Sequence, residues 1–117
     1  LFLVIQHADI DSQEKYLPVL RDAVKSGKAT TDQQALLEDR IAIYRGRRQI
    51  YGSQLAWNMA TGTYYVLPLE DPDNVDMRRK DMGLPPIAEY LQSFGLEWDV
   101  EKYKKELSHI EDRTFKK

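Results

Sequence analysis

Gly52 stands inside a strand-like stretch of mostly polar residues that begins at Gln49 and ends at Gln54. A glycine within a strand commonly marks a bulge or a close approach of another backbone. In a regular strand Gln49, Tyr51 and Ser53 would share one face, because side chains alternate. A bulge at Gly52 would add one residue to the strand, and Gln54 would then join Gln49 and Tyr51 on one side. The stretch therefore predicts an element that presents polar groups as well as filling a core.

Length and composition limit the class of protein. The 117 residues suffice for one hydrophobic core but are too few for two independent ones. A net charge of −2 disfavours a dedicated nucleic-acid binder, which needs a basic surface to release counterions. No apolar run is long enough to cross a bilayer, so a membrane protein is not expected. The chain has no cysteine, which favours a reducing compartment such as the cytoplasm.

The chain begins with an apolar run, Leu1–Ile5, and without a methionine. A secretory signal would need a basic leader, a longer apolar segment and a small-residue cleavage site. We interpret 1–117 as a single domain that is the C-terminal portion of a longer one, with Leu1 to Gln6 as the last turns of a helix. A frayed tail is expected at 113–117.

Helical spacing predicts a first helix from about Asp11 to Gly27. Asp11 and Glu14 have the spacing of an N-terminal capping arrangement. Pro18 lies inside this helix, where it removes a backbone donor and crowds the preceding turn. A bend or a later helix start near Lys15 is therefore expected.

A second helix should follow and form an antiparallel pair with the first. Thr30 with Gln33, or Thr31 with Gln34, can cap its N-terminus. The helix should end near Gly46. Its expected apolar stripe consists of Leu36, Leu37, Ile41 and Tyr44.

The sequence from Gln49 to Trp57 and from Thr63 to Leu67 is rich in β-branched and aromatic residues, separated by a polar loop. This pattern predicts a β-hairpin. A two-stranded ribbon is marginal alone, so its apolar face, including Trp57, Tyr65 and Leu67, should bury against the helices.

Helices are also expected from Val75 to Met82 before Gly83, after Pro85-Pro86, and from a cap at Asp99 onwards. Together these elements predict a mainly α (α+β) fold: a helical domain with one β-hairpin packed on the helices.

Four short strings occur along the chain in a fixed order, and their combination is more specific than any one of them. They are Gln6-His7-Ala8-Asp9, Asp39-Arg40, Gln49-Ile50-Tyr51-Gly52-Ser53-Gln54, and Arg78-Arg79 with Gly83-Leu84-Pro85-Pro86. This order resembles a bacterial family of unknown function that carries Gln-His-Ala-Asp, an Asp-Arg pair and Gln-x-Tyr-Gly-Thr-Gln. Ser53 replaces the usual threonine and keeps the hydroxyl. The resemblance covers most of residues 2–94 and implies a mostly helical domain with further helices upstream, but no activity.

His7 and Asp9 are the candidate catalytic residues. An imidazole titrates near neutrality and can act as a general acid or base, and Asp9 or Asp11 could orient it. Alternatively, His7 ends one helix while Asp9 and Asp11 cap the next. Neither a metal nor a cofactor is expected, because His-x-Asp-x-Asp lacks a recognised ligand spacing and no second histidine lies nearby.

A polar cleft is expected between the start of the chain, the second helix and the hairpin. Neutral amide and phenol groups there suit a small uncharged ligand such as a sugar or nucleobase, and nearby arginines could hold a phosphorylated one. If the cleft is catalytic, a hydrolase-like reaction would use His7 as acid or base, with Arg40 or Tyr51 stabilising negative charge. The candidate ligand-binding residues are Gln6, Asp39, Arg40, Gln49, Tyr51 and Gln54.

The alternative is a non-enzymatic protein-interaction or structural module. The same motif residues would then form a buried polar network that fixes the hairpin on the helices. The partner would bind through apolar or basic surface patches. No phosphate-binding glycine loop, nucleophile elbow or zinc pattern occurs in the sequence, so neither a particular enzyme class nor a particular partner is predicted.

Overall fold

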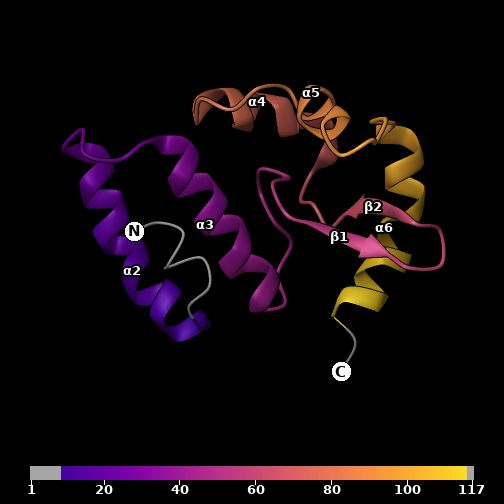
Figure 1. Ribbon diagram of the computed structural model, residues 1–117, viewed down its shortest axis with the longest axis horizontal. Coiled ribbons are helices and arrows are strands. Elements are labelled where there is room, and N and C mark those ends of the chain that lie inside the picture. The colour runs from indigo at the N-terminus through magenta and orange to yellow at the C-terminus, as the bar shows by residue number, and fades with distance from the viewer. Residues whose placement is uncertain (1–8, 116–117) are drawn as a thin grey trace.

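The computed structural model describes residues 9–115. Helices α2 and α3 precede a single hairpin and helices α4 to α6 follow it in the described part of the chain, as expected for an α+β fold (Figure 1). The predicted helix end at Leu1 to Gln6 lies outside the described residues. No helix within the described part of the chain has both the length and the apolar character to cross a bilayer. In order, the elements are α2 (Ile10–Lys25), α3 (Thr31–Tyr44), β1 (Leu55–Asn58), β2 (Thr63–Val66), the 3-10 turn η1 (Pro72–Asn74), α4 (Val75–Asp81), α5 (Ile87–Gln92) and α6 (Val100–Thr114).

Helix α2 starts earlier than its sequence predicts. Asp9 is its N-cap, and the Asp9 carboxylate accepts a hydrogen bond of 2.9 Å from the Ser12 N–H. The prediction of a cap at Asp11 was therefore wrong. The helix also runs through Pro18 without a later start near Lys15. Pro18 is exposed, so its ring takes up no space in the core, and the helix loses only one backbone hydrogen bond there.

Helix α3 begins and ends where its sequence predicts. The Thr30 N–H donates to Oε1 of Gln33 at 3.2 Å, which is the first of the two predicted capping pairs. Gly46, with φ of 77°, follows the last turn and ends the helix. The predicted stripe is only partly buried: Leu37 and Ile41 lie in the core, whereas Tyr44 is exposed.

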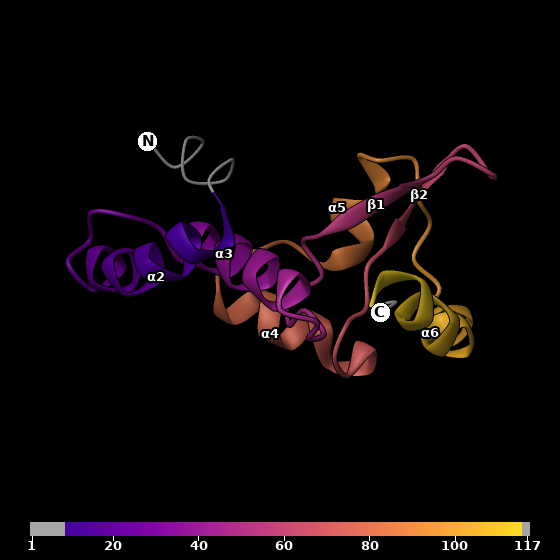
Figure 2. The same cartoon turned by 90° about the horizontal axis from the view of Figure 1, so that it is seen from below.

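The α2 and α3 helices lie side by side and run antiparallel (Figures 1 and 2). Arg21 pairs with Glu38 at 3.4 Å, and Arg45 at the end of α3 pairs with Asp11 at the start of α2 at 2.8 Å. A small apolar cluster lies between the two helices. Its buried members are Leu20, Leu37 and Ile41.

The hairpin is shorter than predicted. Leu55 lies opposite Val66 and Asn58 opposite Thr63 in an antiparallel pair, while residues 49–54 form a loop. The prediction that the first strand starts at Gln49 was wrong, because the Gln49 N–H donates to Pro68 O at 2.8 Å instead of joining this ladder.

The two faces of the hairpin also differ from the expected arrangement. Trp57 lies opposite Tyr64 and is 53% exposed, whereas Tyr65 lies opposite Ala56. Because side chains alternate along a strand, Trp57 and Tyr65 project to opposite faces. Trp57 shares its face with Tyr64 and the buried Val66 but is itself exposed, so the prediction that it buries against the helices was wrong.

A larger apolar cluster joins the hairpin to the last three helices. It shares no member with the cluster between α2 and α3, so apolar packing alone does not unite the described part of the molecule. Helix α6 includes Arg113 and Thr114, so it extends into the stretch predicted to fray. The buried members of the larger cluster are Val66, Leu69, Val75, Ile87, Leu91, Tyr103, Leu107 and Ile110.

Candidate functional site: a buried network around loop 49–54

The carboxylate of Asp39 is the centre of a buried polar network. Asp39 lies on α3 with no exposed surface. It accepts hydrogen bonds from the N–H groups of Ile50 at 2.8 Å, Tyr51 at 3.0 Å and Ser53 at 3.0 Å. The Ser53 hydroxyl donates a further one at 2.7 Å. Burial raises the pKa of Asp39, and these four hydrogen bonds act in the opposite direction by stabilising its charged form.

Arginines bind the carbonyl groups on the other side of the same loop. Arg78 Nε donates to Ile50 O at 2.8 Å, and Arg79 Nη1 donates to Tyr51 O at 2.6 Å. The middle of the loop therefore lies between one acidic side chain, which binds three of its N–H groups, and two basic ones, which bind two of its carbonyls. This arrangement fixes the loop backbone without any regular secondary structure.

Arg79 is almost completely buried, and that burial lowers its pKa. Its Nε donates to Pro85 O at 2.7 Å, and its guanidinium lies 4.9 Å from the centre of the Tyr90 ring. The Tyr90 hydroxyl in turn donates to Ser53 O at 2.8 Å. The sequence did not predict this role: the Arg78-Arg79 pair was considered as one of the four strings and as part of a possible phosphate-binding patch, and nothing in the sequence singled out Tyr90.

Gly52 lets the loop turn against helix α5. Its φ is 71°, in the left-handed region that favours glycine. A Cβ atom at this position would lie 2.6 Å from Cδ1 of Ile87. Gly52 is therefore needed for close packing in a loop, and the predicted bulge in a strand was wrong.

The side chain of Gln49 takes the place of a peptide group at the base of the hairpin. Its Oε1 accepts from the Gln54 N–H at 2.8 Å. Its Nε2 donates to Gln54 O and to Leu67 O, both at 2.9 Å. Gln49 is fully buried, so this amide gives the Gln54 N–H a partner away from water. It also adds a second hydrogen bond to each of the two carbonyls, which accept from the Leu67 N–H and the Tyr103 hydroxyl as well.

Three predicted ligand-binding residues lie at the margin of this network and are partly exposed. Tyr51 belongs to the loop itself, and partial burial raises the pKa of its side chain. Gln54 Nε2 donates to the Ser53 hydroxyl at 3.2 Å. The guanidinium of Arg40 forms no hydrogen bond or ion pair with the residues that the structure describes.

Asp9 is exposed at the start of α2 and caps that helix, as the alternative interpretation of this residue predicted. Hydrogen bonds from Ser12 lower its pKa. Its partners among residues 9–115 do not include the network around Asp39. Gln6 and His7 lie outside the described residues, so their proposed roles stay predictions.

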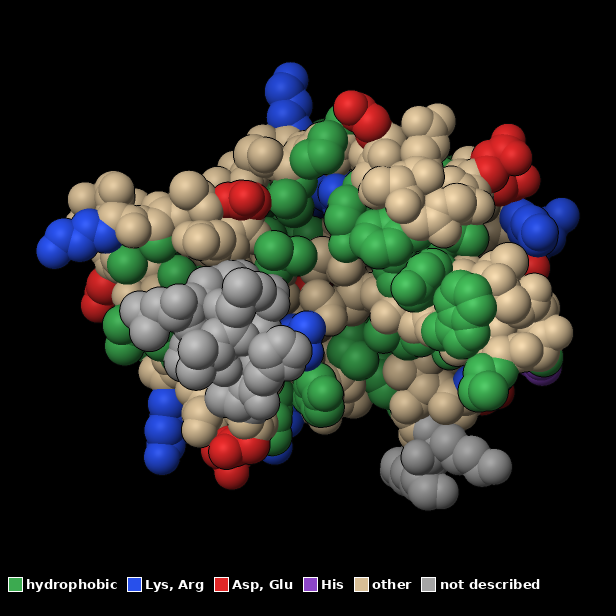
Figure 3. Space-filling model, viewed as in Figure 1, with side chains coloured by type: hydrophobic (Ala, Val, Ile, Leu, Met, Phe, Trp, Pro, Cys, Tyr) green, Lys and Arg blue, Asp and Glu red, His purple; other side chains and the backbone are tan. Residues whose placement is uncertain are grey.

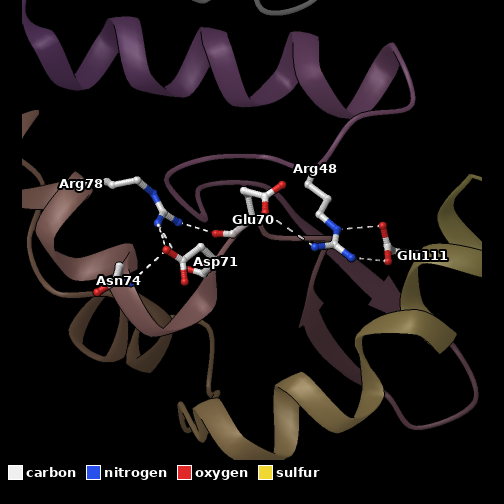
Figure 4. A network of polar contacts seen from close by, with 6 residues as sticks. All are labelled: Arg48, Glu70, Asp71, Asn74, Arg78 and Glu111. Atoms are coloured by element: carbon white, nitrogen blue, oxygen red, sulfur yellow. Dashed lines mark hydrogen bonds and ion pairs between the residues drawn. The ribbon is translucent and has the colours of Figure 1, made fainter.

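Arg48 and Arg78 also connect separate segments of the fold (Figure 4). Arg48 binds both carboxylate oxygens of Glu111 on α6, at 2.8 and 2.7 Å, and lies 3.7 Å from Glu70. Arg78 also donates to the backbone carbonyls of Glu70 and Asp71. These contacts engage several of the arginines that were considered for a phosphate-binding patch.

The Arg48–Glu111 pair predicts a dependence of stability on pH. Hydrogen bonds from Arg48 lower the pKa of Glu111, so the pair stabilises the domain above the ordinary pKa of a glutamate and loses this effect as the pH falls. The two side chains are 34% and 27% exposed, which limits the effect to about 1 kcal/mol at neutral pH. Glu111→Gln should therefore lower the free energy of unfolding by this amount in urea titrations near pH 7.

The difference between Glu111→Gln and the wild type should shrink as the pH falls through the lowered folded-state pKa of Glu111, and it should vanish where the glutamate is protonated in both states. Glu106→Gln is the matched control, because this residue is exposed on the same helix and forms no ion pair with a described residue. A difference that stays constant across the pH range would contradict the role of this ion pair.

Comparison with models of protein families shows to which family the chain belongs. A model of DUF6624, a family of unknown function, matches residues 1–101. The chain belongs to this family. All four strings of the sequence fall within the DUF6624 match, which ends at the start of α6. No curated protein and no solved structure matches the chain.

No group of three or more His, Asp or Glu side chains in residues 9–115 is placed to hold a metal ion.

Proposed function

We propose that this domain is a protein-interaction module whose motif residues form an internal framework and whose hairpin end provides the contact surface. The supporting observation is the burial of Asp39 and Gln49. All hydrogen bonds that their side chains form with described residues are to loop 49–54 or to Leu67. The four acceptor positions of the Asp39 carboxylate and both N–H groups of the Gln49 amide are thus occupied inside the fold.

Energetics favour this framework role. A ligand that reached Asp39 would have to displace backbone N–H groups from a carboxylate, and each buried donor left unpaired costs about 1–3 kcal/mol. The framework also lies between the two apolar clusters, where hydrogen bonds replace apolar packing. Its main effect is to hold the α2–α3 pair against the hairpin and the remaining helices.

The contact surface is an aromatic ridge, which we define as Trp57, Tyr64 and Phe94. Their rings meet edge to face, with centroids 4.9 Å apart for Trp57 and Tyr64 and 5.4 Å apart for Tyr64 and Phe94. All three are exposed, and hydrophobic side chains gather over the hairpin and α5 on one face (Figure 3). Tryptophan and tyrosine are the residues that most often dominate binding energy at protein interfaces.

A photo-crosslinking amino acid tests this proposal in the cells that produce the protein. Placed at Trp57, p-benzoylphenylalanine should give a discrete adduct with a partner protein. Placed at Met77, which is 69% exposed on α4 and distant from the ridge in sequence, it should give none. Phe94→Ser should lower the yield of the adduct formed at position 57 without changing the melting temperature. Equal crosslinking at both positions, or none at either, would contradict the proposal.

A small-ligand site is the second candidate. Tyr51, Gln54 and Arg40 are partly exposed beside a loop that is fixed from beneath, and a preorganised loop lowers the entropic cost of binding. Under this proposal a small uncharged or phosphorylated ligand binds there. In a hydrolase-like version His7 acts as acid or base and Asp9 orients it. A sugar or nucleotide that raises the melting temperature of the wild type but not of Tyr51→Phe would favour this candidate.

A further inference from the structure

The hairpin leaves one edge of β2 without a partner strand. Beyond the last pair of the two strands, the Leu67 N–H donates to Gln54 O at 3.2 Å and so continues the ladder. In an antiparallel ladder, residues whose backbone groups face the partner strand alternate with residues whose groups face away. Counting back from Leu67, the N–H and C=O groups of Val66 and Tyr64 face away from β1.

These outward groups have no hydrogen-bond partner among the residues that the structure describes. Val66 is only 5% exposed, and buried backbone groups are nearly always paired in folded proteins. The strand Thr63–Val66 also contains no proline or lysine, which commonly protect an open edge from further pairing. The outer edge of β2 is therefore suited to accept another strand.

A cleft of about 330 Å³ lies along this edge. Its hairpin residues come from β2 and the turn, with only Asn58 from β1, so the cleft lies on the β2 side. The connector between α5 and α6 runs alongside β2 and forms another wall (Figure 2). The buried, mostly apolar side chains that line the cleft are Val66, Leu91, Tyr103 and Ile110.

The charged side chains at the rim of this β2-edge cleft have a net charge of −1. The rim carries Glu97, Asp99 and Glu106 against Lys102 and Arg113. The Arg113 guanidinium already lies over the Tyr65 ring at 4.9 Å. By contrast, Glu97 and Glu106 are exposed and have no ion-pair partner in residues 9–115. A basic side chain would complement these two glutamates.

We propose that an extended segment of a partner protein adds to β2 as a third strand in this cleft. Its backbone pairs with Tyr64 and Val66, its apolar side chains face Leu91 and Ile110, and alternate lysine or arginine side chains face the acidic rim. This inference rests on the proposed interaction function and names the chemistry of the partner. A second copy of the chain fits less well, since Thr63–Val66 carries no basic residue to meet the rim.

The test begins with a random peptide library displayed on phage and selected on the 117-residue chain. Selected peptides should alternate β-branched or aromatic residues with lysine or arginine and should lack proline in the binding segment. The most enriched peptide, labelled with a fluorophore, is then the probe, and its Kd is measured by anisotropy.

Tyr64→Pro and Tyr64→Val form the matched pair of variants. Both remove the ring, but only proline removes the outward N–H and blocks a third strand. The ladder to β1 does not use this N–H, so the hairpin should remain. The Kd of the probe should be about tenfold or more higher for Tyr64→Pro than for Tyr64→Val. Glu97→Lys should also raise it. Equal affinities of the proline and valine variants would overturn the inference.

A second measurement keeps the test valid if Tyr64→Pro does not fold. Methylating alternate backbone nitrogens of the probe should abolish binding in one register and spare it in the other, and equal effects in both registers would overturn the inference. If the Kd of the peptide is unaffected by the substitutions and by the backbone methylation, but a crosslink forms at Trp57, only the edge site is rejected and the proposed function stands. If no peptide is selected and no crosslink forms, both the edge site and the proposed interaction function are rejected. A concentration-dependent dimer that Tyr64→Pro abolishes would make a second copy the occupant and overturn the choice of partner.

Discussion

Asp39→Asn should lower the free energy of unfolding by about 3–5 kcal/mol, the range found when one partner of a buried charged network is removed. Asparagine has nearly the same shape as aspartate but places an NH₂ group where a carboxylate oxygen accepts hydrogen bonds. One pair of loop donors, either those of Ile50 and Tyr51 or those of Ser53, would then face another donor. The buried Arg79 would also lose one of the two carboxylates, Asp76 and Asp39, whose negative charges favour its charged form.

Urea unfolding followed by circular dichroism measures this change. Asp22→Asn is the matched control, because Asp22 is exposed on α2 and its replacement should change the free energy of unfolding by no more than about 0.5 kcal/mol. A loss below about 1 kcal/mol for Asp39→Asn would contradict the framework role. It would make this carboxylate a ligand-binding candidate again.

Elements fixed by local signals could be predicted from the sequence. Thr30 with Gln33 at the start of α3, and Asp99 at the start of α6, are capping signals that act over three residues. The hairpin was also predicted, because its two strands flank a recognisable polar turn. Such signals act within a few residues and do not depend on the rest of the fold.

The loop at 49–54 could not be predicted in the same way, because distant residues determine its conformation. The Asp39 carboxylate that binds its N–H groups lies 11 to 14 residues earlier, and the arginines that bind its carbonyls lie 28 residues later. The preference of Ile50 and Tyr51 for a strand contributes less free energy than the many specific hydrogen bonds that hold the loop. Pattern reasoning therefore predicted a strand where tertiary contacts form a loop.

The residues of the candidate site were likewise predicted only in part from the sequence. Asp39 and Gln49 were selected because polar residues in such a pattern need partners, and the structure places both in a buried network, as the alternative interpretation expected. The β2-edge cleft was not predicted, since it depends on α6 and the connector packing beside a strand that is distant in sequence. The ligand-binding roles of Tyr51, Gln54 and Arg40 stay predictions.

Gly52→Ala should lower the free energy of unfolding by about 2–5 kcal/mol, for two separable reasons. An alanine held at a positive φ costs about 1–2 kcal/mol, and overpacking a buried contact typically costs about 1–3 kcal/mol more. Gly46→Ala isolates the first term, because Gly46 has φ of 77° but a Cβ atom there would meet no other part of the fold within 4 Å. Urea unfolding of both variants should therefore show a larger loss at Gly52 than at Gly46.

A double-mutant cycle with Ile87→Val separates the contact from the backbone strain. Valine lacks Cδ1, the atom that would lie 2.6 Å from the new Cβ, while the next atom, Cγ1, lies at an ordinary 3.7 Å. In the Ile87→Val background, Gly52→Ala should therefore cost no more than Gly46→Ala does in the wild type. If the cost stays the same in both backgrounds, contact with Ile87 is not the reason for glycine, and the conformation of the loop alone requires it.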